Sequence, residues 1–163
     1  MVFQVILLVL GILCLFGALV LLFYPRWVTA AVPAFAGLVL LHWSYFIAVP
    51  TSTFVFWGIA MAMIWGITYM SPSGEIDGRG SSNIYVSTSA IAGALLGMIV
   101  DPRIMVLGVI IGAFVGELAY SRTPHGKWLS QSTPVFLRYY CAKCFPAVVA
   151  VSIIGIAIEG FIQ

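Results

Sequence analysis

The sequence predicts an all-α, polytopic integral membrane protein that forms a single transmembrane domain over residues 1–163. Composition gives the first two observations: 63% of the residues are apolar and only 7% are charged, outside the range of soluble globular domains. The third observation is that the apolar residues form six runs, divided by short polar or proline-containing connections. The length suffices for about five or six spans of ~20 residues each, so we expect any function to be carried out in or at the lipid bilayer.

The six runs cover residues 2–24, 28–49, 53–71, 86–100, 104–121 and 144–162. The first run lacks a basic leading segment and is longer than the core of a signal peptide, so we interpret it as a retained transmembrane helix anchored by Arg26 and Trp27. The fourth run, at about 15 residues, is only about 22 Å long as a helix, against about 30 Å for the hydrocarbon core. The fourth and fifth runs therefore either both cross the bilayer or form a re-entrant hairpin.

The segment that leads into the sixth run, TPVFLRYYCAKCFP, carries the signals of a helix start. Thr133 is suited to the N-cap and Pro134 to the first helical position. We expect this helix to lie in the membrane interface and to turn inward near Pro146. Arg138 and Lys143 are then interfacial basic residues at the level of the lipid headgroups.

The basic residues are distributed unequally between the two sides of a six-span protein. The connections after the first, third and fifth runs hold Arg26, Arg79, Arg122, Lys127, Arg138 and Lys143, whereas the other side holds only Arg103. The positive-inside rule then predicts that both termini are non-cytoplasmic in a bacterial inner membrane. The net charge of +2 includes no basic run, so a nucleic-acid partner is not expected.

Small residues recur every four positions on both sides of the sequence Asp-Pro-Arg at 101–103. Such spacing makes a ridge on one face of each helix, and close packing through small residues is the main means by which helices associate in lipid. We therefore expect an antiparallel glycine-zipper hairpin, with a dimer contact or a gating role as the alternatives. Folding at 102–103 pairs Gly97 with Gly108, Gly93 with Gly112, and Ser89 with Gly116.

Residues 89–120, SAIAGALLGMIVDPRIMVLGVIIGAFVGELAY, resemble the double glycine-zipper core of the bacterial membrane-protein family catalogued as domain of unknown function 456. The match includes the family's Gly-Ala-Phe-x-Gly-Glu-Leu signature at residues 112–118, and Lys143 is the candidate for its downstream lysine. The amino-terminal half departs from the family pattern, with YPRW at the first turn and Thr68 at the end of the third helix. The resemblance implies a multi-helix inner-membrane fold and no particular mechanism.

Glu117 is an acid within the fifth apolar run, about 100° around the helix from Gly116, so it does not face the hairpin partner. Its stripe contains Ile110, Ala113 and either Tyr120 or Ser121, and must meet another helix, a polar cavity or a second subunit. A carboxylate at membrane depth costs several kcal/mol unless it is paired or hydrated.

Two interpretations of Glu117 remain open from the sequence. In the first, the carboxylate binds a proton, a cation or a substrate, with Arg122 beside it. In the second, it reaches the membrane interface and pairs with Arg122 or Lys127, because both lie within a few turns of it. The burial of the carboxyl group distinguishes the two.

His42 and the pair Cys141 and Cys144 are weaker candidates. His42 could couple to protons near neutral pH, or it could belong to an aromatic belt with Trp43 and Tyr45. The two thiols have the spacing of a redox or metal pair, but no second pair completes a four-ligand site, so we expect reduced, structural cysteines. No catalytic triad or paired carboxylates stand out, and we predict no enzyme, no cofactor and no metal.

These observations lead to two hypotheses about function. The first is a small transporter or carrier for an ion, a small solute or a lipid headgroup, with Glu117 as the binding acid and His42 in a secondary role. The second is a non-transporting membrane scaffold or assembly protein whose helices dock partner helices. Its partner would be a second copy of the chain or another membrane protein.

Overall fold

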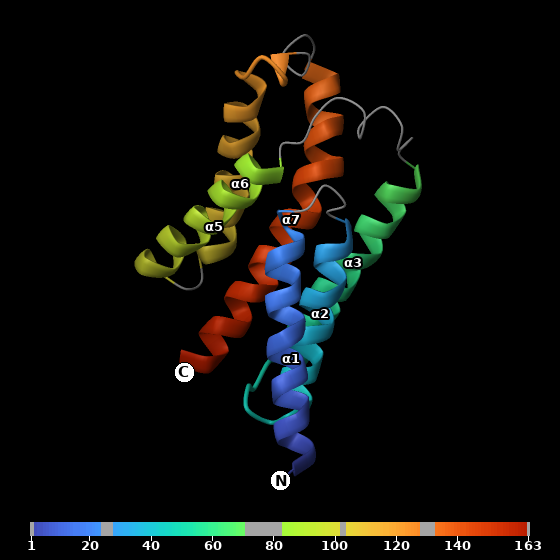
Figure 1. The fold of residues 1–163 in the computed structure, drawn as a ribbon, viewed down its shortest axis with the longest axis vertical. Coiled ribbons are helices and arrows are strands. Elements are labelled where there is room, and N and C mark those ends of the chain that lie inside the picture. Colours follow the sequence, from blue (N-terminus) through green and yellow to red (C-terminus); the bar gives the residue numbers. More distant parts are fainter. Residues whose placement is uncertain (1, 24–27, 71–82, 102–103, 128–132, 163) are drawn as a thin grey trace.

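A computed structural model describes residues 2–23, 28–70, 83–101, 104–127 and 133–162 (Figure 1). The described residues are all-α, as predicted, with six helices and no strand. In chain order the helices are α1 (Val2–Leu21), α2 (Val28–Trp43), α3 (Thr51–Met70), α5 (Asn83–Val100), α6 (Met105–Ser121) and α7 (Thr133–Ile162).

Two helices, α2 and α7, differ in their bounds from the predicted apolar runs. Helix α2 ends at Trp43 rather than near residue 49, because the chain enters the left-handed region at Tyr45, where φ is 61°. Helix α7 begins at Thr133, as predicted, but continues to Ile162 as one helix with Pro146 inside it. The inward turn expected near Pro146 is instead a change of direction within one helix (Figure 1), consistent with the backbone hydrogen bond that a proline cannot donate.

The helices form two antiparallel hairpins, and α7 passes between them (Figure 1). One hairpin consists of α1 and α2, the other of α5 and α6, and α7 contacts every other described helix. The side chain of Ser87 in α5 joins the two hairpins, since its Oγ donates a hydrogen bond of 2.8 Å to the carbonyl of Leu22 at the end of α1. This carbonyl belongs to a helix terminus, where no partner exists within the helix.

All six helices contribute apolar side chains to the core of the bundle, and many of these come from α2 and α7. Ala30, Ala34 and Leu38 are fully buried in α2, as are Ile153 and Ala157 in α7. Large apolar side chains, by contrast, cover much of the outer surface: Phe3 is 71% exposed, Phe16 64% and Ile99 80%. Helix α1 is largely exposed, since its buried residues are Gly11 and Ala18.

Two described helices are long and apolar enough to cross a bilayer, by length and composition alone: Val2–Leu21 and the part of α7 from Cys144 to Ile162. Four shorter apolar helices accompany them. The first and last described residues lie at the same end of the bundle, which we call the terminal end, and α1, α3 and α6 all end at the opposite side (Figure 1).

Candidate functional site

Glu117 is completely buried, with no exposed surface. It is the one buried carboxylic acid among the described residues, where the other buried polar side chains are Ser44, Ser87, Ser121 and Ser152. Glu117 follows the fully buried Ala113 by four residues, about one helical turn, so it lies on the same side of α6, which faces the bundle interior. The acid therefore lies inside the protein and not at its surface.

The face of α6 that carries Glu117 packs against α7. The thiol of Cys144 donates a hydrogen bond to Oε2 of Glu117, with a sulfur-to-oxygen distance of 3.5 Å. One turn earlier on α7, the hydroxyl of Tyr140 donates to the carbonyl of Ile110 at 3.4 Å, and its ring meets Phe114 edge-on with centroids 5.7 Å apart. The helix that the Glu117 stripe must meet is thus α7.

Tyr120 extends this polar group along α6. It follows Glu117 by three residues, so the two side chains lie on neighbouring positions of one helix face. Tyr120 is only 3% exposed, and its hydroxyl has no hydrogen-bond partner among the described residues. Its ring lies 5.8 Å from that of Tyr85 in α5, so side chains of α5, α6 and α7 come together around the buried acid.

The group formed by Glu117, Tyr120 and Cys144 is called the acid cluster below. A carboxylate in an apolar interior is stable only where it carries a proton or where positive charge and hydrogen bonds balance it. A thiol is a weak hydrogen-bond donor and supplies little of that balance. The cluster therefore brings a carboxyl, a thiol and a phenol together inside the helix bundle.

The sequence did not identify Cys144 as a member of this site. Cys144 lies 11 residues into α7, whereas Glu117 lies four residues before the end of α6, so the two do not stand at matching distances from the connection. Their contact depends on where α7 begins and on its tilt, and no spacing in the sequence encodes either. Tyr120 was placed on the correct stripe, as an alternative to Ser121.

Arg122 lies at the end of α6, where its backbone N–H bonds to the carbonyl of Ala119 at 3.3 Å, and its side chain is exposed. The full burial of Glu117 favours the interpretation of the acid as an interior residue over that of an interfacial one. Arg138 and Lys143 belong to α7, but their side chains lie outside the described residues.

His42 lies at the terminal end of the bundle, whereas the acid cluster lies toward the opposite end, where α6 ends (Figure 1). The structure therefore does not bring these two predicted site residues together. Nδ1 of His42 accepts a hydrogen bond from the backbone N–H of Val49 at 3.4 Å, and the ring meets Phe54 edge-on at 4.9 Å. Its neighbours Trp43 and Tyr45 are 62% and 85% exposed.

The glycines of α5 and α6 meet backbone to backbone. A Cβ added at Gly93 would fall on the carbonyl of Gly108, and one added at Gly108 would fall on the carbonyl of Gly93. A Cβ added at Gly112 would likewise fall on the carbonyl of Ser89. These positions accept glycine alone, because real side chains do not approach a backbone atom so closely.

The register of this contact differs from the predicted one-to-one pairing. A Cβ at Gly108 would also stand 3.3 Å from Cα of Gly97, so Gly108 lies between two small residues of α5. Gly116 similarly faces the carbonyl of Tyr85, one turn before Ser89. The rows interdigitate with a half-step offset, because the ridge of one helix packs into the groove of the other.

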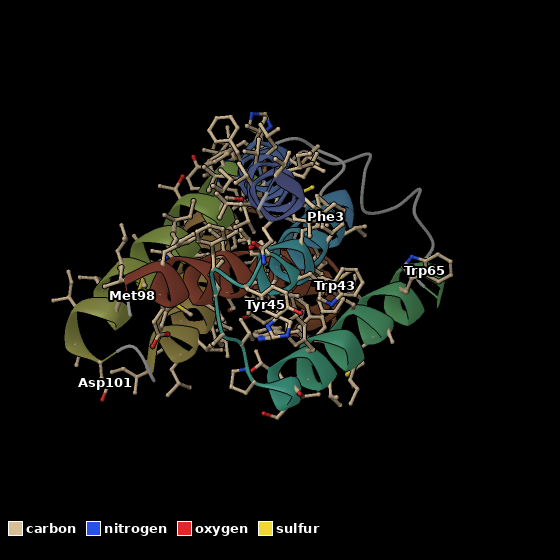
Figure 2. All side chains as sticks on the ribbon, turned by 90° about the horizontal axis from the view of Figure 1, so that it is seen from below. Phe3, Trp43, Tyr45, Trp65, Met98 and Asp101 are labelled. Atoms are coloured by element: carbon tan, nitrogen blue, oxygen red, sulfur yellow. The ribbon has the colours of Figure 1, made fainter. Side chains whose placement is uncertain are left out.

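A shallow apolar groove of about 610 Å³ follows the outer side of the α5–α6 hairpin. Its described lining contains no charged side chain, and Ser89 is its one hydroxyl. Exposed aliphatic side chains form its walls, among them Leu96 on α5 and Leu107 and Ile111 on α6. Asp101 marks the tip of the hairpin and points outward (Figure 2).

Neither Cys14 nor Cys144 forms a disulfide, and within the described ranges no three His, Cys, Asp or Glu side chains come together to hold a metal ion. Comparison of the chain with models of protein families, with curated proteins and with solved structures gave no match.

Proposed function

We propose that the chain is a six-span bacterial inner-membrane protein that carries an ion, a small solute or a lipid headgroup, with Glu117 as the binding acid. The full burial of this carboxyl group against Cys144 is the observation that carries the proposal. Retaining an acid there is costly, and acids inside membrane helices commonly mark ion or substrate pathways.

The apolar outer surface supports the membrane location. Side chains such as Phe3, Leu13 and Phe16 of α1 are more than half exposed, and an apolar surface of this extent is stable in lipid but would associate in water. The resemblance of residues 89–120 to the family catalogued as domain of unknown function 456 agrees with an inner-membrane protein. We place the end of the bundle that carries Arg122 and Lys127 on the cytoplasmic side.

The carrier proposal is tested by ion flux in liposomes. The purified protein is reconstituted with a pH-sensitive dye inside, and proton entry is followed under a potassium diffusion potential, first alone and then with monovalent cations and small solutes outside. We expect Glu117→Gln to abolish protein-dependent flux while the variant folds, because the amide keeps the shape of the side chain and removes its charge.

The matched control is Asp101→Asn, which removes an exposed carboxylate at the hairpin tip and should leave flux unchanged. Wild-type flux in Glu117→Gln would contradict the proposal. Tryptophan fluorescence and thermal unfolding in detergent establish that the variant is folded before the flux is compared.

The second candidate is a membrane scaffold that docks partner helices, and the groove on the α5–α6 hairpin favours it. Small residues at its floor and aliphatic walls fit the ridge of another helix. A cysteine at Leu96 or Ile111 should then form a specific cross-link with a second copy or a membrane partner, whereas a cysteine at the buried Ala113 should not. Recovery of only monomers from all three positions would oppose this candidate.

A further inference from the structure

The connection between α2 and α3, residues 44–50, is held in a tight and unusual conformation. Tyr45 has a φ of 61°, in the left-handed region that bulky residues rarely adopt. Its N–H bonds to the carbonyl of His42 at 3.0 Å, and Oγ of Ser44 donates to the carbonyl of Leu41 at 2.6 Å. The strained residue persists because the surrounding contacts fix the connection.

This connection also attaches α2 and α3 to the central helix. The side chain of Ile47 is 2% exposed and covers Gly160 of α7, where an added Cβ would collide with it. Val49, two residues further, is 7% exposed, so its backbone N–H lies in an apolar setting. A buried N–H needs an acceptor, and Nδ1 of His42 is that acceptor.

The acceptor works in one protonation state only. A nitrogen that accepts a hydrogen bond carries no proton, so this contact requires a neutral His42 ring with its proton on Nε2. A second proton on the imidazole would occupy Nδ1, so the Nδ1–H would face the N–H of Val49 and the hydrogen bond could not form. Histidine is the side chain that makes this change between about pH 5 and about pH 8.

We propose that His42 is a proton-operated latch for the 44–50 connection. When the ring is neutral, its bond to Val49 closes the connection and holds Ile47 on Gly160. When the ring takes a second proton, the amide of Val49 loses its acceptor and the connection at the terminal end opens. His42 is partly exposed and lies in the last turn of α2, so the latch takes its proton from the solution at that end of the bundle. This inference is independent of the carrier proposal.

The surroundings of His42 contain few other titratable groups. Phe54 contacts it from α3, and the described side chains of α3, residues 51–66, include none that titrates. Tyr45 is on the connection itself, and α7 contributes Glu159, next to the Gly160 that Ile47 covers. Glu159→Gln therefore serves as a control that removes the nearby carboxylate and leaves the latch in place.

The test measures the imidazole and the amide together by NMR in detergent micelles. The chain has two histidines, so His125→Gln leaves His42 as the one imidazole. While the ring is neutral we expect a proton on Nε2 and none on Nδ1, and the pH is lowered stepwise until the imidazole signals show a proton on both nitrogens. Over the same range, hydrogen exchange at the Val49 amide, corrected for its intrinsic pH dependence, should accelerate about fivefold, the factor expected for loss of one ordinary hydrogen bond.

Two variants separate the latch from a merely structural histidine. His42→Asn keeps an acceptor near the place of Nδ1 without titration, so exchange at Val49 should become independent of pH. His42→Phe keeps the aromatic contact with Phe54 but no acceptor, so exchange should be fast at every pH. If either variant fails to fold, the imidazole and Val49 amide measurements on the protein with its native His42 still test the proposal.

A proton on Nδ1 of the neutral ring, or a corrected Val49 exchange rate that does not change as the ring takes up its second proton, would overturn the proposal. A pH-dependent exchange rate in His42→Asn equal to that of the wild type would also overturn it. Loss of the pH dependence of Val49 exchange in Glu159→Gln would show that Glu159, and not His42, is the titrating group, and would overturn the proposal.

Discussion

The two helical hairpins use glycine in different ways. In the α5–α6 hairpin, a Cβ added at Gly93, Gly108 or Gly112 would meet a backbone carbonyl of the facing helix. In the α1–α2 hairpin, a Cβ added at Gly11 would meet mainly the side chain of Leu41, at 2.8 and 2.9 Å, with the carbonyl of Gly37 at 3.2 Å. The first contact is backbone on backbone along several turns. In the second, a Cβ added at Gly37 would stand 3.0 Å from the carbonyl of Gly11, but the shortest contact, at Gly11, is with a side chain that can move.

This difference shows that glycine spacing alone does not measure how closely two helices approach. Gly17 in α1 and Gly58 in α3 have nothing within 4 Å of an added Cβ, although they too lie in apolar helices. The α1–α2 hairpin instead buries alanines such as Ala30, Ala31 and Ala34. Substitutions at the contact positions test whether the two hairpins differ in this way.

Gly93→Ala should have the largest effect, because its methyl group would overlap the carbonyl of Gly108 and force the helices of the α5–α6 hairpin apart. Overpacking of this kind costs about 1–3 kcal/mol or more. Thermal unfolding of the purified protein in detergent measures the loss. The control is Gly58→Ala, which has open space around it and should be neutral or slightly stabilising. Equal effects of the two changes would refute the close contact.

Gly11→Ala should destabilise the α1–α2 hairpin by less, about 1 kcal/mol, since the Leu41 side chain that it meets can change its rotamer. The same unfolding measurement, made beside Gly93→Ala, gives the difference between the hairpins. Replacing Leu41 by Ala in the Gly11→Ala background should relieve the overlap. A loss as large as that of Gly93→Ala would show that both hairpins pack alike.

Ser87→Ala removes the hydrogen bond that joins the hairpins and leaves the Leu22 carbonyl without that donor. We expect a loss of about 1 kcal/mol in the free energy of unfolding. The matched control is Ser152→Ala, because Ser152 is also fully buried but its hydroxyl has no hydrogen-bond partner among the described residues. The control should be neutral or stabilising, and the reverse order of the two effects would contradict the structure.

Tyr140→Phe should have the smallest effect, about 0.5 kcal/mol, since the bond from its hydroxyl to the Ile110 carbonyl is long, at 3.4 Å, and the ring contact with Phe114 remains. Tyr140→Ala removes the ring as well and should cost clearly more. A large loss in Tyr140→Phe would mean that the hydroxyl, and not the ring, holds α7 against α6.

The helices and the special position of Glu117 could be predicted from the sequence, because both follow from local patterns. Apolar runs ended by proline or polar residues predicted all six helices, and the period of the α-helix turned Glu117 away from the glycine row of its own helix. The start of α7 at Thr133 followed from Thr133 and Pro134. These inferences need only the spacing of residues within one element.

The tertiary structure alone decided what lies opposite each of these elements. Packing set the half-step register of the glycine rows, the burial of Glu117 and its contact with Cys144, and the distance between His42 and the acid cluster. Each depends on how far one helix slides or tilts against another. The sequence of an apolar helix constrains this weakly, because many registers bury nearly the same apolar area, whereas close contacts between whole helices select one of them.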